Sequence, residues 1–422
     1  MKLTLFPTLA VVCGLLLTAK PASAQVGTLG TVWQRQAGGP HAYWSAIASS
    51  ADGTKLIASL RNGGNSTPSV YLSTNSGITW SPTGISQDIP FARSVASSAN
   101  GQILAVATFY GLYVSTNSGA TWDNRGGGDR WWGIACSTNG TTMVAGIIHG
   151  PLYTSTDSGT TWTARAPSTP GVWADMASSG DGSKLVALSG EPSSPGQMYI
   201  SANSGTNWTT VSFGSTSQYW AGVASSADGT KLVAVDAYDS TSPHGGFGAI
   251  YTSSDSGSNW ITTTIMTLSW ASVACSYDGS KIIISSANNL SDTSLTPGWL
   301  FTSTDSGATW QPNNAPTSDN WAIVTSSADG TKLAAVNVEH NNALGYIYTY
   351  ATPATNTPTL NIATAGANSF LLWPWPATGY LLQQNTNLTS TNWVNLAGTP
   401  AMMNLLIAPQ TNNQNFYRLV HP

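Results

Sequence analysis

Charged side chains are scarce in this chain. Lys and Arg number 14, and Asp and Glu number 18, among 422 residues, which gives a formal net charge of -4. So few positive charges cannot build the broad basic surface that holds a nucleic acid or an anionic membrane. We therefore expect no nucleic-acid partner, and the polar character of the chain comes from Ser, Thr, Asn and Gly.

Long apolar runs are also missing, except at the N-terminus. There Lys2 precedes an apolar stretch at 3–18, and Ala22-Ser23-Ala24 supplies the small residues that a signal peptidase requires. We expect residues 1–24 to be a signal peptide and the mature protein to be secreted, whether periplasmic, cell-surface or extracellular. No later stretch reaches the roughly 20 apolar residues of a membrane-spanning helix, so we expect no integral membrane segment in the mature chain.

Cysteine and metal-binding patterns are nearly absent. Cys13 lies in the expected signal peptide, and Cys136 and Cys275 occupy equivalent places in two copies of a repeat that are three copies apart. Such places in a ring exceed the Cα separation of about 7 Å that a disulfide allows, so we expect two small buried thiols. The chain has no His-x-x-x-His, no Cys-x-x-Cys and no calcium-loop spacing, and we expect neither a metal nor a cofactor.

The dominant feature that is present is a repeat of 40 to 50 residues, found seven times. Each copy has an aromatic residue, a run of small residues, an Asn-Gly or Asp-Gly turn, an apolar run and an aromatic strand. The turn glycines are Gly53, Gly101, Gly140, Gly182, Gly229, Gly279 and Gly330. Four strand-length segments per period are typical of propeller blades. We predict an all-β, seven-bladed β-propeller of four-stranded blades over residues 25–350.

One copy shows how a blade is built. Trp44-Ser-Ala-Ile-Ala-Ser-Ser is followed by Asp52-Gly53 and then by Thr54-Lys-Leu-Ile-Ala. Asp-Gly favours the tight turn that joins two antiparallel strands, so these segments are expected to be the first two strands, with small residues at the crowded centre of the ring. Val70-Tyr71-Leu72 is the expected third strand, and an aromatic residue recurs at its centre in every copy.

The third strand leads into the pattern Ser-x-Asp/Asn-Ser-Gly, with Trp three residues after the Gly. It begins at Ser73, Ser115, Ser155, Ser201, Ser253 and Ser303. This element resembles the Asp-box, or BNR repeat, of the sialidase-like propeller superfamily, and is also similar to photosystem assembly factor-like and sortilin-like propellers. The resemblance implies a structural turn on the face opposite the active site. Its Asp or Asn residues are Asn75, Asn117, Asp157, Asn203, Asp255 and Asp305, and its tryptophans are Trp80, Trp122, Trp162, Trp208, Trp260 and Trp310.

The two ends of the repeat predict how the ring closes. The seventh copy ends near Tyr348 without a fourth strand, whereas Thr31-Val-Trp33-Gln-Arg35 looks like an isolated fourth strand. We predict that this N-terminal strand completes the last blade and so removes two open sheet edges. Residues 351–358 are a linker by composition, and 359–422 resemble a small C-terminal β module of secreted bacterial proteins. The resemblance lies in Trp373-Pro374, Gly379-Tyr380-Leu-Leu-Gln383, Trp393 and Phe416-Tyr-Arg-Leu419.

The loops between the second and third strands and the crossovers between blades vary, whereas the other turns are uniform. Repeat proteins place insertions on their binding face, so we expect any site on this loop-bearing face. Ionisable residues that break the repeat fall there, although loops are polar in any case. The weak catalytic candidates are Asp175, Glu191, Asp236, Asp239, Glu339, His149, His244, His340 and Arg93.

Tryptophan provides a second set of candidates. Six indoles share one place, eight residues before the turn Asp or Asn: Trp44, Trp131, Trp173, Trp220, Trp270 and Trp321. At the mouth of the axial channel they could stack on sugar rings and bind a ligand. The alternative is that they pack as wedges between blades, and we favour this alternative.

A catalytic interpretation meets several obstacles. A sialidase needs three arginines around the substrate carboxylate, but blades 5 to 7 contain no arginine, and the family's Phe-Arg-Ile-Pro element is missing. Glycoside hydrolases need two carboxylates roughly 5 to 10 Å apart, and the tandem-propeller hydrolases use a cleft between two propellers. We predict a binding or scaffold module for a glycan or cell-surface protein. The alternative is a glycoside hydrolase or polysaccharide lyase that uses the loop-bearing face.

Overall fold

The structure is a computed structural model. It describes residues 33–36, 38–61, 69–85, 91–168, 172–190, 195–213, 218–237, 248–265, 268–286, 298–313, 315, 320–338 and 344–351, and six strands within 361–420. The chain divides into two units, residues 31–355 and the combination of 1–30 with 356–422. The described residues form strands, turns and bends, and they include no helix long and apolar enough to cross a membrane.

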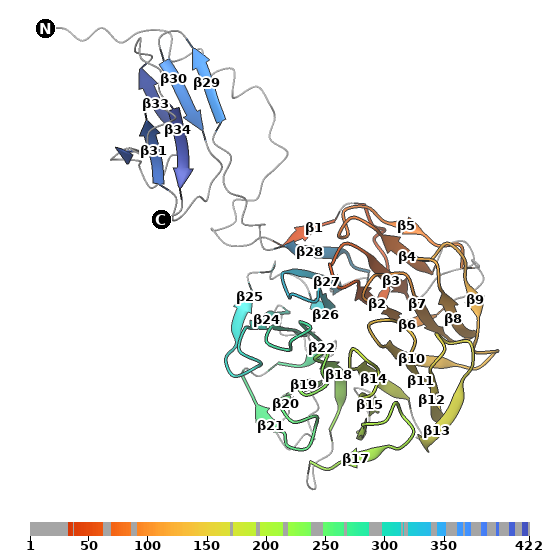
Figure 1. Ribbon diagram of the computed structural model, residues 1–422. Coiled ribbons are helices and arrows are strands. Elements are labelled where there is room, and N and C mark those ends of the chain that lie inside the picture. Colours follow the sequence, from red (N-terminus) through yellow and green to blue (C-terminus); the bar gives the residue numbers. More distant parts are fainter. Residues whose placement is uncertain are drawn as a thin grey trace, which may run out of the picture. The chain divides into compact units, whose positions relative to one another are not determined.

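Between residues 34 and 351, the described strands form seven four-stranded antiparallel sheets arranged as a ring of blades (Figure 1). Blade 1 holds β2 (Trp44–Ser49), β3 (Leu56–Leu60), β4 (Val70–Ser73) and β5 (Ser81–Pro82), and blade 2 holds β6 (Ala92–Ser97), β7 (Leu104–Thr108), β8 (Gly111–Ser115) and β9 (Asp123–Asn124). Blade 3 holds β10 (Trp131–Cys136), β11 (Met143–Ile147), β12 (Pro151–Ser155) and β13 (Thr163–Ser168), and blade 4 holds β14 (Trp173–Ser178), β15 (Leu185–Ser189), β16 (Met198–Ser201) and β17 (Thr209–Val211). Blade 5 holds β18 (Trp220–Ser225), β19 (Leu232–Asp236), β20 (Ile250–Ser253) and β21 (Ile261–Thr263). Blade 6 holds β22 (Trp270–Cys275), β23 (Ile282–Ser286), β24 (Leu300–Ser303) and β25 (Gln311–Asn313), and blade 7 holds β26 (Asn320–Ser326), β27 (Lys332–Val338), β28 (Ile347–Ala351) and β1 (Gln34–Arg35).

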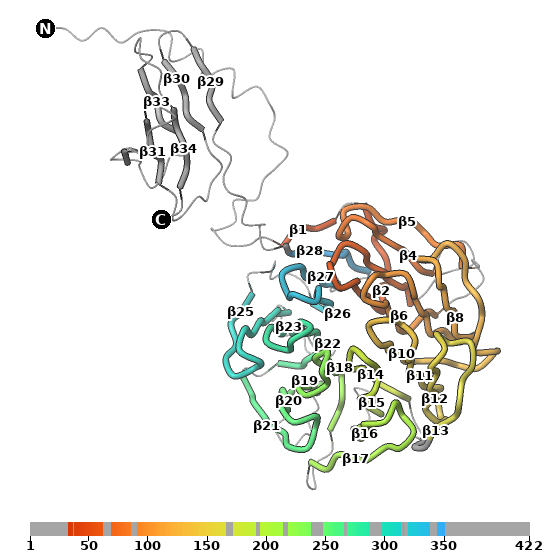
Figure 2. The backbone as a smooth tube through the Cα atoms, viewed as in Figure 1, coloured from red at the N-terminus to blue at the C-terminus, as the bar shows by residue number. Residues whose placement is uncertain are grey.

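We call the four strand positions A to D, from the centre of the ring to its outer edge (Figure 2). Neighbouring A strands contact one another around the axis, from β2 with β6 to β26 with β2. Strand B is buried along its whole length in blade 1, because it has a neighbouring strand on each side and a blade on each face. The predicted all-β, seven-bladed propeller is confirmed.

The A–B turns are held by their own polar side chain. In blade 1 one carboxylate oxygen of Asp52 accepts the Ser50 hydroxyl at 2.6 Å and the Thr54 N–H at 3.0 Å. The hydrogen bonds, first of all the one from Ser50, lower the pKa of Asp52 to about 2. Gly53 has a φ of +67°, which a residue with a Cβ rarely adopts. The turn therefore keeps an ionised acceptor and requires glycine after it.

The A–B turns also form a closed ring of backbone hydrogen bonds. The residue before each turn Asp or Asn donates its N–H to the carbonyl oxygen of the equivalent residue in the next blade. The donors, in order, are Ala51, Ala99, Thr138, Gly180, Ala227, Tyr277 and Ala328, and Ala328 returns to Ala51 at 2.7 Å. Every bond crosses a blade boundary, so this ring ties the blades together at one end of the axis.

The C–D turns depend on a hydroxyl and on an Asp or Asn side chain. In blade 3 the Ser155 hydroxyl donates to Asp157 at 2.7 Å, and Asp157 accepts the N–H and the hydroxyl of Thr161 at 2.8 and 2.7 Å. In blade 1 Asn75 accepts the Thr79 N–H at 2.9 Å, but its amide donates to the Thr79 hydroxyl. Exchange of Asp for Asn thus reverses one hydrogen bond and preserves the turn.

The N-terminal segment completes the seventh blade. β1 pairs antiparallel with β28, with Arg35 opposite Tyr348. Trp33 is 4% exposed, its ring lies 5.9 Å from that of Trp321, and its indole N–H donates to Asn313 of blade 6 at 3.1 Å. The predicted closure by the N-terminal strand is confirmed, and both pairing and packing hold it.

The second unit contains two small sheets. β29 (Asn361–Ala365), β30 (Asn368–Leu372) and β33 (Leu405–Pro409) form one sheet in that order. β32 (Val394–Asn395), β31 (Leu381–Asn385) and β34 (Phe416–Val420) form the other. The expected signal peptide at 1–24 and most of the expected linker at 351–358 lie outside the described residues.

Candidate ligand-binding site at the axial channel

Strand A carries the same irregularity in every blade. One extra residue stands between two paired residues near the start of the strand, as Ser45 does between Trp44 and Ala46. A bulge of this kind redirects a side chain, here toward the axial channel. The seven extra residues, all in the channel wall, are Ser45, Arg93, Trp132, Ala174, Ala221, Ala271 and Ala322. Blades 4 to 7 therefore contribute only alanine at this place, and the larger side chains come from blades 1 to 3.

Arg93 forms a cluster with three aromatic residues, Phe91, Phe109 and Trp132. Its guanidinium carbon lies 4.0 Å from the centre of the Trp132 ring and 5.2 Å from that of Phe109. The ring centroids of Phe91 and Phe109 are 5.4 Å apart, and those of Phe109 and Trp132 are 5.6 Å apart. Cation–π contacts hold the flat guanidinium in one orientation. We call these four residues the Arg93 cluster.

The backbone at Phe91 is strained. Its φ is +71°, in the left-handed region that bulky side chains avoid. Such a conformation costs on the order of 1–3 kcal/mol and persists where the surrounding structure requires it. Here it immediately precedes strand A of blade 2 and brings the Phe91 ring against Phe109.

A cavity of about 450 Å³ is lined by Arg93 and Trp132 of the Arg93 cluster and by the four alanines. Its size falls within the roughly 300–1,000 Å³ of small-molecule sites. Alanine, valine and isoleucine make up most of its lining, and small hydroxyl side chains such as Ser45, Ser94 and Ser272 lie between them. Ser272 accepts the Val324 N–H at 3.3 Å and keeps a hydroxyl proton to donate. The cavity can therefore exchange hydrogen bonds with a polar ligand next to a fixed positive charge.

Asp175 is the acidic side chain among the described residues of this cavity wall. One of its oxygens accepts the N–H of Met176 at 2.8 Å, and the other accepts the N–H of Val223 in blade 5 at 2.9 Å. Burial, opposed by these two hydrogen bonds, raises its pKa to about 6. The Ser272 hydroxyl binds the N–H of the next blade in the same way, so Asp175 serves as a bridge between blades.

Asp236 lies away from the channel, at the end of strand B in blade 5, and is 1% exposed. It accepts the Ala249 N–H and, at 3.3 Å, the Tyr251 hydroxyl. Side chains at the same place in other blades also accept an N–H at the start of strand C: Ser189 from Gln197, Ser286 from Trp299 and Asn337 from Tyr346. Asp236 is thus one of a series of groups that hold the B–C connection. Burial raises its pKa to about 7.

The remaining catalytic candidates do not join this cavity in the described structure. His149 is exposed in the tight turn between β11 and β12, with a φ of +56°. Glu191, Asp239, His244, Glu339 and His340 lie outside the described residues. Of the nine candidates, the cavity wall brings together Arg93 and Asp175. Among the described residues, no three His, Cys, Asp or Glu side chains gather as a metal site would require.

The six aligned tryptophans are buried between blades rather than facing the channel. They are 0–6% exposed: Trp44, Trp131, Trp173, Trp220, Trp270 and Trp321. Trp173 of blade 4 packs edge-on against Tyr199, with centroids 5.6 Å apart, and donates its indole N–H to the Gly150 carbonyl of blade 3 at 3.1 Å. No face of these rings is open to a sugar, and this placement matches the wedge packing that the sequence favoured.

The residues that the sequence analysis missed stand one position further along. Trp132 follows the aligned Trp131, and Phe109 follows the last residue of strand B in blade 2. A signal existed, because four of the seven residues in this column are alanine and Arg93 and Trp132 depart from it. This signal is not apparent in the sequence, because the alternation of inward and outward side chains in a regular strand does not show where a bulge lies.

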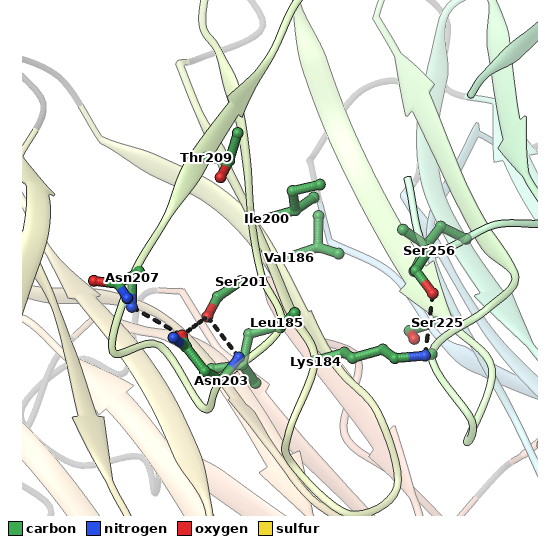
Figure 3. A pocket seen from close by; sticks show the side chains of 13 residues that line it. Lys184, Leu185, Val186, Ile200, Ser201, Asn203, Asn207, Thr209, Ser225 and Ser256 are labelled. Carbon is green, nitrogen blue, oxygen red and sulfur yellow. Dashed lines mark hydrogen bonds between the residues drawn. The ribbon is translucent and has the colours of Figure 1, made fainter. Parts of the chain in front are cut away.

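A second cavity, of about 260 Å³, lies between blades 4 and 5 (Figure 3). Lys184 reaches Ser256 there at 3.1 Å, and apolar side chains such as Leu185 and Ile200 also line the cavity. A smaller cavity with equivalent lining, including Lys332 and Ser76, lies between blades 7 and 1. Because equivalent cavities occur between two different pairs of blades, we attribute them to the way neighbouring blades pack and not to a specific binding site.

Comparison with known proteins supports the fold. No protein-family model and no curated protein matches the sequence. Similar solved structures include YCF48 bound to D1 peptide (TM-score 0.52, 17% identity, covering 76% of this chain and 97% of that one) and YCF48 from Cyanidioschyzon merolae (0.55, 12%, 76% and 99%). An ancestral GH74 enzyme is also similar (0.53, 15%, 82% and 53%). At these identities the likeness shows a shared seven-bladed β-propeller architecture.

Proposed function

We propose that this protein is a secreted binding module that takes a glycan at the mouth of the axial channel. The observation that carries the proposal is the Arg93 cluster, a fixed cation with three aromatic rings, from which Arg93 and Trp132 reach a cavity that also contains Ser and Thr hydroxyls. Aromatic rings and small hydroxyls are groups that bind sugars, through stacking and hydrogen bonds. The expected signal peptide supports the extracellular setting in which such a ligand occurs.

The proposal includes a structural role for the six C–D turns as Asp-boxes. Their support is the hydrogen-bond pattern of Ser155, Asp157 and Thr161 and its counterpart at Asn75. These turns lie at the opposite ends of the blades from the Arg93 cluster, since strand C runs from the B–C loop to the C–D turn. The binding face and the turn face are therefore separate.

Two alternatives remain to be tested against this proposal. A glycoside hydrolase or polysaccharide lyase would need a second acid or base next to Asp175, whose oxygens both accept backbone N–H groups. A cell-surface protein partner is the other alternative, because a propeller of this architecture, YCF48, has been seen with a peptide bound.

A glycan array combined with a blocked variant tests the function. Ala271→Trp introduces in blade 6 the side chain that blade 3 has at the same bulge position, Trp132. The backbone of this position therefore accepts a tryptophan, and the new side chain fills the cavity. Glycan binding that is lost in this variant and kept in Ile261→Trp, at a site 70% exposed on the outer strand β21, supports the proposal. Binding that survives Ala271→Trp contradicts it. Release of reducing sugar from the bound glycan would show an enzyme.

A further inference from the structure

A third cavity, of about 710 Å³, lies between the outer strands of blades 4 and 5, where β17 and β21 form the outer side of the ring (Figure 1). β17 and the residues after it, up to Phe213, line one side, and the outer part of blade 5 lines the other. Thr209 and Asn259 are exposed on the two sides, so the cavity is open to solvent. We call it the rim cleft. Its volume is within the roughly 300–1,000 Å³ of small-molecule sites, and its lining shares no residue with that of the axial cavity.

The rim cleft lacks a side chain that spans the gap between two other blades. In blade 2 the residue three after the tryptophan of the C–D turn is Arg125, and its guanidinium donates to the Thr160 hydroxyl of blade 3 at 2.9 Å. The equivalent residues in blades 4 and 5 are Val211 and Ser258, and both line the rim cleft. Valine is too short to cross to the next blade, so the gap stays open.

Three aromatic rings line the rim cleft, those of Phe213, Tyr251 and Trp260. Phe213 stands edge-on to both others, with ring centroids 5.0 Å from Tyr251 and 5.9 Å from Trp260. The Trp260 indole N–H donates to the Gly257 carbonyl at 3.0 Å, which holds the ring in one orientation. In the sequence, the residue five after the tryptophan of each blade is aromatic only in blade 4, where it is Phe213. The cleft thus has a fixed aromatic surface on which the apolar face of a ligand can pack.

Most of the other lining residues are polar but uncharged. Six small or amide side chains join the aromatic rings: Thr209, Thr210, Ser212, Ser258, Asn259 and Thr262. None of the described residues that line the cleft is acidic or basic. The Asp255 carboxylate, which binds Asn259, stays ionised because hydrogen bonds, first of all the one from the Asn259 N–H, lower its pKa. The cleft therefore offers hydrogen bonds without a counter-charge for an anion.

Asn259 has hydrogen-bonding groups to spare. At this place four of the six C–D turns have a threonine, and in blade 3 the Thr161 hydroxyl donates to Asp157. Asn259 makes the same contact with one amide hydrogen, which it donates to Asp255 at 2.6 Å. It retains a carbonyl oxygen and a second amide hydrogen. A donor and an acceptor on one planar group match two neighbouring hydroxyls of a sugar ring.

We propose that the rim cleft is a second binding site, which takes a neutral sugar, with the sugar ring against the aromatic rings and its hydroxyls on Asn259 and the threonines. The site is separate from the axial channel and does not depend on the function proposed for that channel. A neutral sugar is favoured over a charged one because no described lining residue is acidic or basic. It is favoured over a peptide because most of the lining is polar and uncharged, which leaves few partners for apolar or charged peptide side chains.

Calorimetry on the full chain tests the site, with cellohexaose, mannohexaose, xylohexaose and maltohexaose as probes. At least one is expected to bind, with an affinity that added salt does not change. The double variant Ile200→Thr/Val211→Arg copies into blade 4 the pair that blade 3 carries, where the Arg165 Nε donates to the Thr154 hydroxyl at 2.9 Å. The new arginine fills the cleft, so this variant should lose the binding and keep its melting temperature.

Thr263→Arg is the matched control for the double variant. It places an arginine at the same position of blade 5, which already has Thr252 where blade 3 has Thr154, and neither residue lines the rim cleft. This variant should bind the sugar like the wild type.

Asn259→Thr tests the amide and preserves the turn, because threonine is the residue at this place in four other blades. It should weaken binding of the sugar about tenfold. Asn207→Thr makes the same exchange in blade 4, where Asn207 lines the cavity of Figure 3 and not the rim cleft, and should leave the affinity unchanged.

The outcomes separate the rim cleft from the axial channel. A wild-type protein that binds none of the four probes, or a bound probe that the double variant binds equally well, overturns the rim site. A probe that is lost in Ala271→Trp and kept in the double variant belongs to the axial channel and also overturns it. Tighter binding of glucuronate oligomers than of the neutral probes overturns the neutral ligand. A peptide that competes for the cleft when no sugar binds there overturns the sugar.

Discussion

The buried carboxylate of Asp236 makes a sharp prediction about stability. Its pKa is raised from about 3.8 to about 7 by burial, so the folded protein holds this proton more tightly than the unfolded chain does. The contribution of Asp236 to the free energy of unfolding is therefore fully present below about pH 4, and it is lost as the pH rises toward and through 7. A difference of about 3 pKa units corresponds to about 4 kcal/mol, and local relaxation around the charge is expected to reduce this to about 2–4 kcal/mol.

Asp236→Asn removes the titration and keeps an acceptor oxygen for the Ala249 N–H. Blade 7 shows that the fold accepts this amide, because Asn337 accepts the Tyr346 N–H at the same place. We expect the free energy of unfolding of the variant, minus that of the wild type, to grow by about 2–4 kcal/mol between pH 4 and pH 8. Denaturant unfolding at a series of pH values measures it, and subtraction cancels the other titrating groups.

The reverse exchange provides the control. Asn337→Asp should introduce a loss of stability with rising pH that the wild type does not have at this blade. A stability difference between Asp236→Asn and wild type that stays flat from pH 4 to pH 8 would refute the reasoning, because it would mean that the carboxylate is ionised at no cost.

Three further predictions concern closure and turns. Trp33→Ala should lower the stability of the propeller by about 3–5 kcal/mol, measured by denaturant unfolding, because it leaves a cavity where Trp33 packs against Trp321 of blade 7. Gly180→Ala should lower the melting temperature, and Tyr277→Phe in the same chain should restore part of it, since the phenol oxygen is the side-chain atom closest to the added methyl. Asp157→Asn should cost less than about 0.5 kcal/mol and Asp157→Ala about 1–2 kcal/mol in unfolding experiments, because only the alanine leaves the Thr161 N–H without its acceptor.

Several features of this propeller could be predicted from short stretches of sequence. The Asp-Gly and Asn-Gly turns, the Ser-x-Asp/Asn-Ser-Gly turns and the aromatic third strands depend on interactions within a few residues, such as Asp52 with Thr54. The Asp-Gly or Asn-Gly turn and the aromatic third strand each recur seven times and the Ser-x-Asp/Asn-Ser-Gly turn six times, so the number of blades followed from counting the first two. The closing strand could also be predicted from the sequence, because Trp33 precedes Trp44 by eleven residues, the same spacing by which Trp162 precedes Trp173.

The residues of the candidate binding site could not be predicted from the sequence in the same way. A bulge of one residue decides that Trp131 is buried between blades while its neighbour Trp132 faces the channel, and strand alternation cannot reveal this. Asp236 looked catalytic because it is an unusual acid in a loop region, but its register places it among structural acceptors. For both Trp132 and Asp236, the pairing of the strand with its neighbour determines where the side chain lies and therefore what it does.

The sequence alone determined the structure of the blade, that is, its turns, its core aromatic residues and the number of repeats, because these depend on neighbours a few residues away. What the tertiary structure alone decided is which side chains meet. The approach of Arg93 to Trp132 and of Tyr277 to Gly180 joins different blades, and only the packing of the blades around the axis brings such residues together.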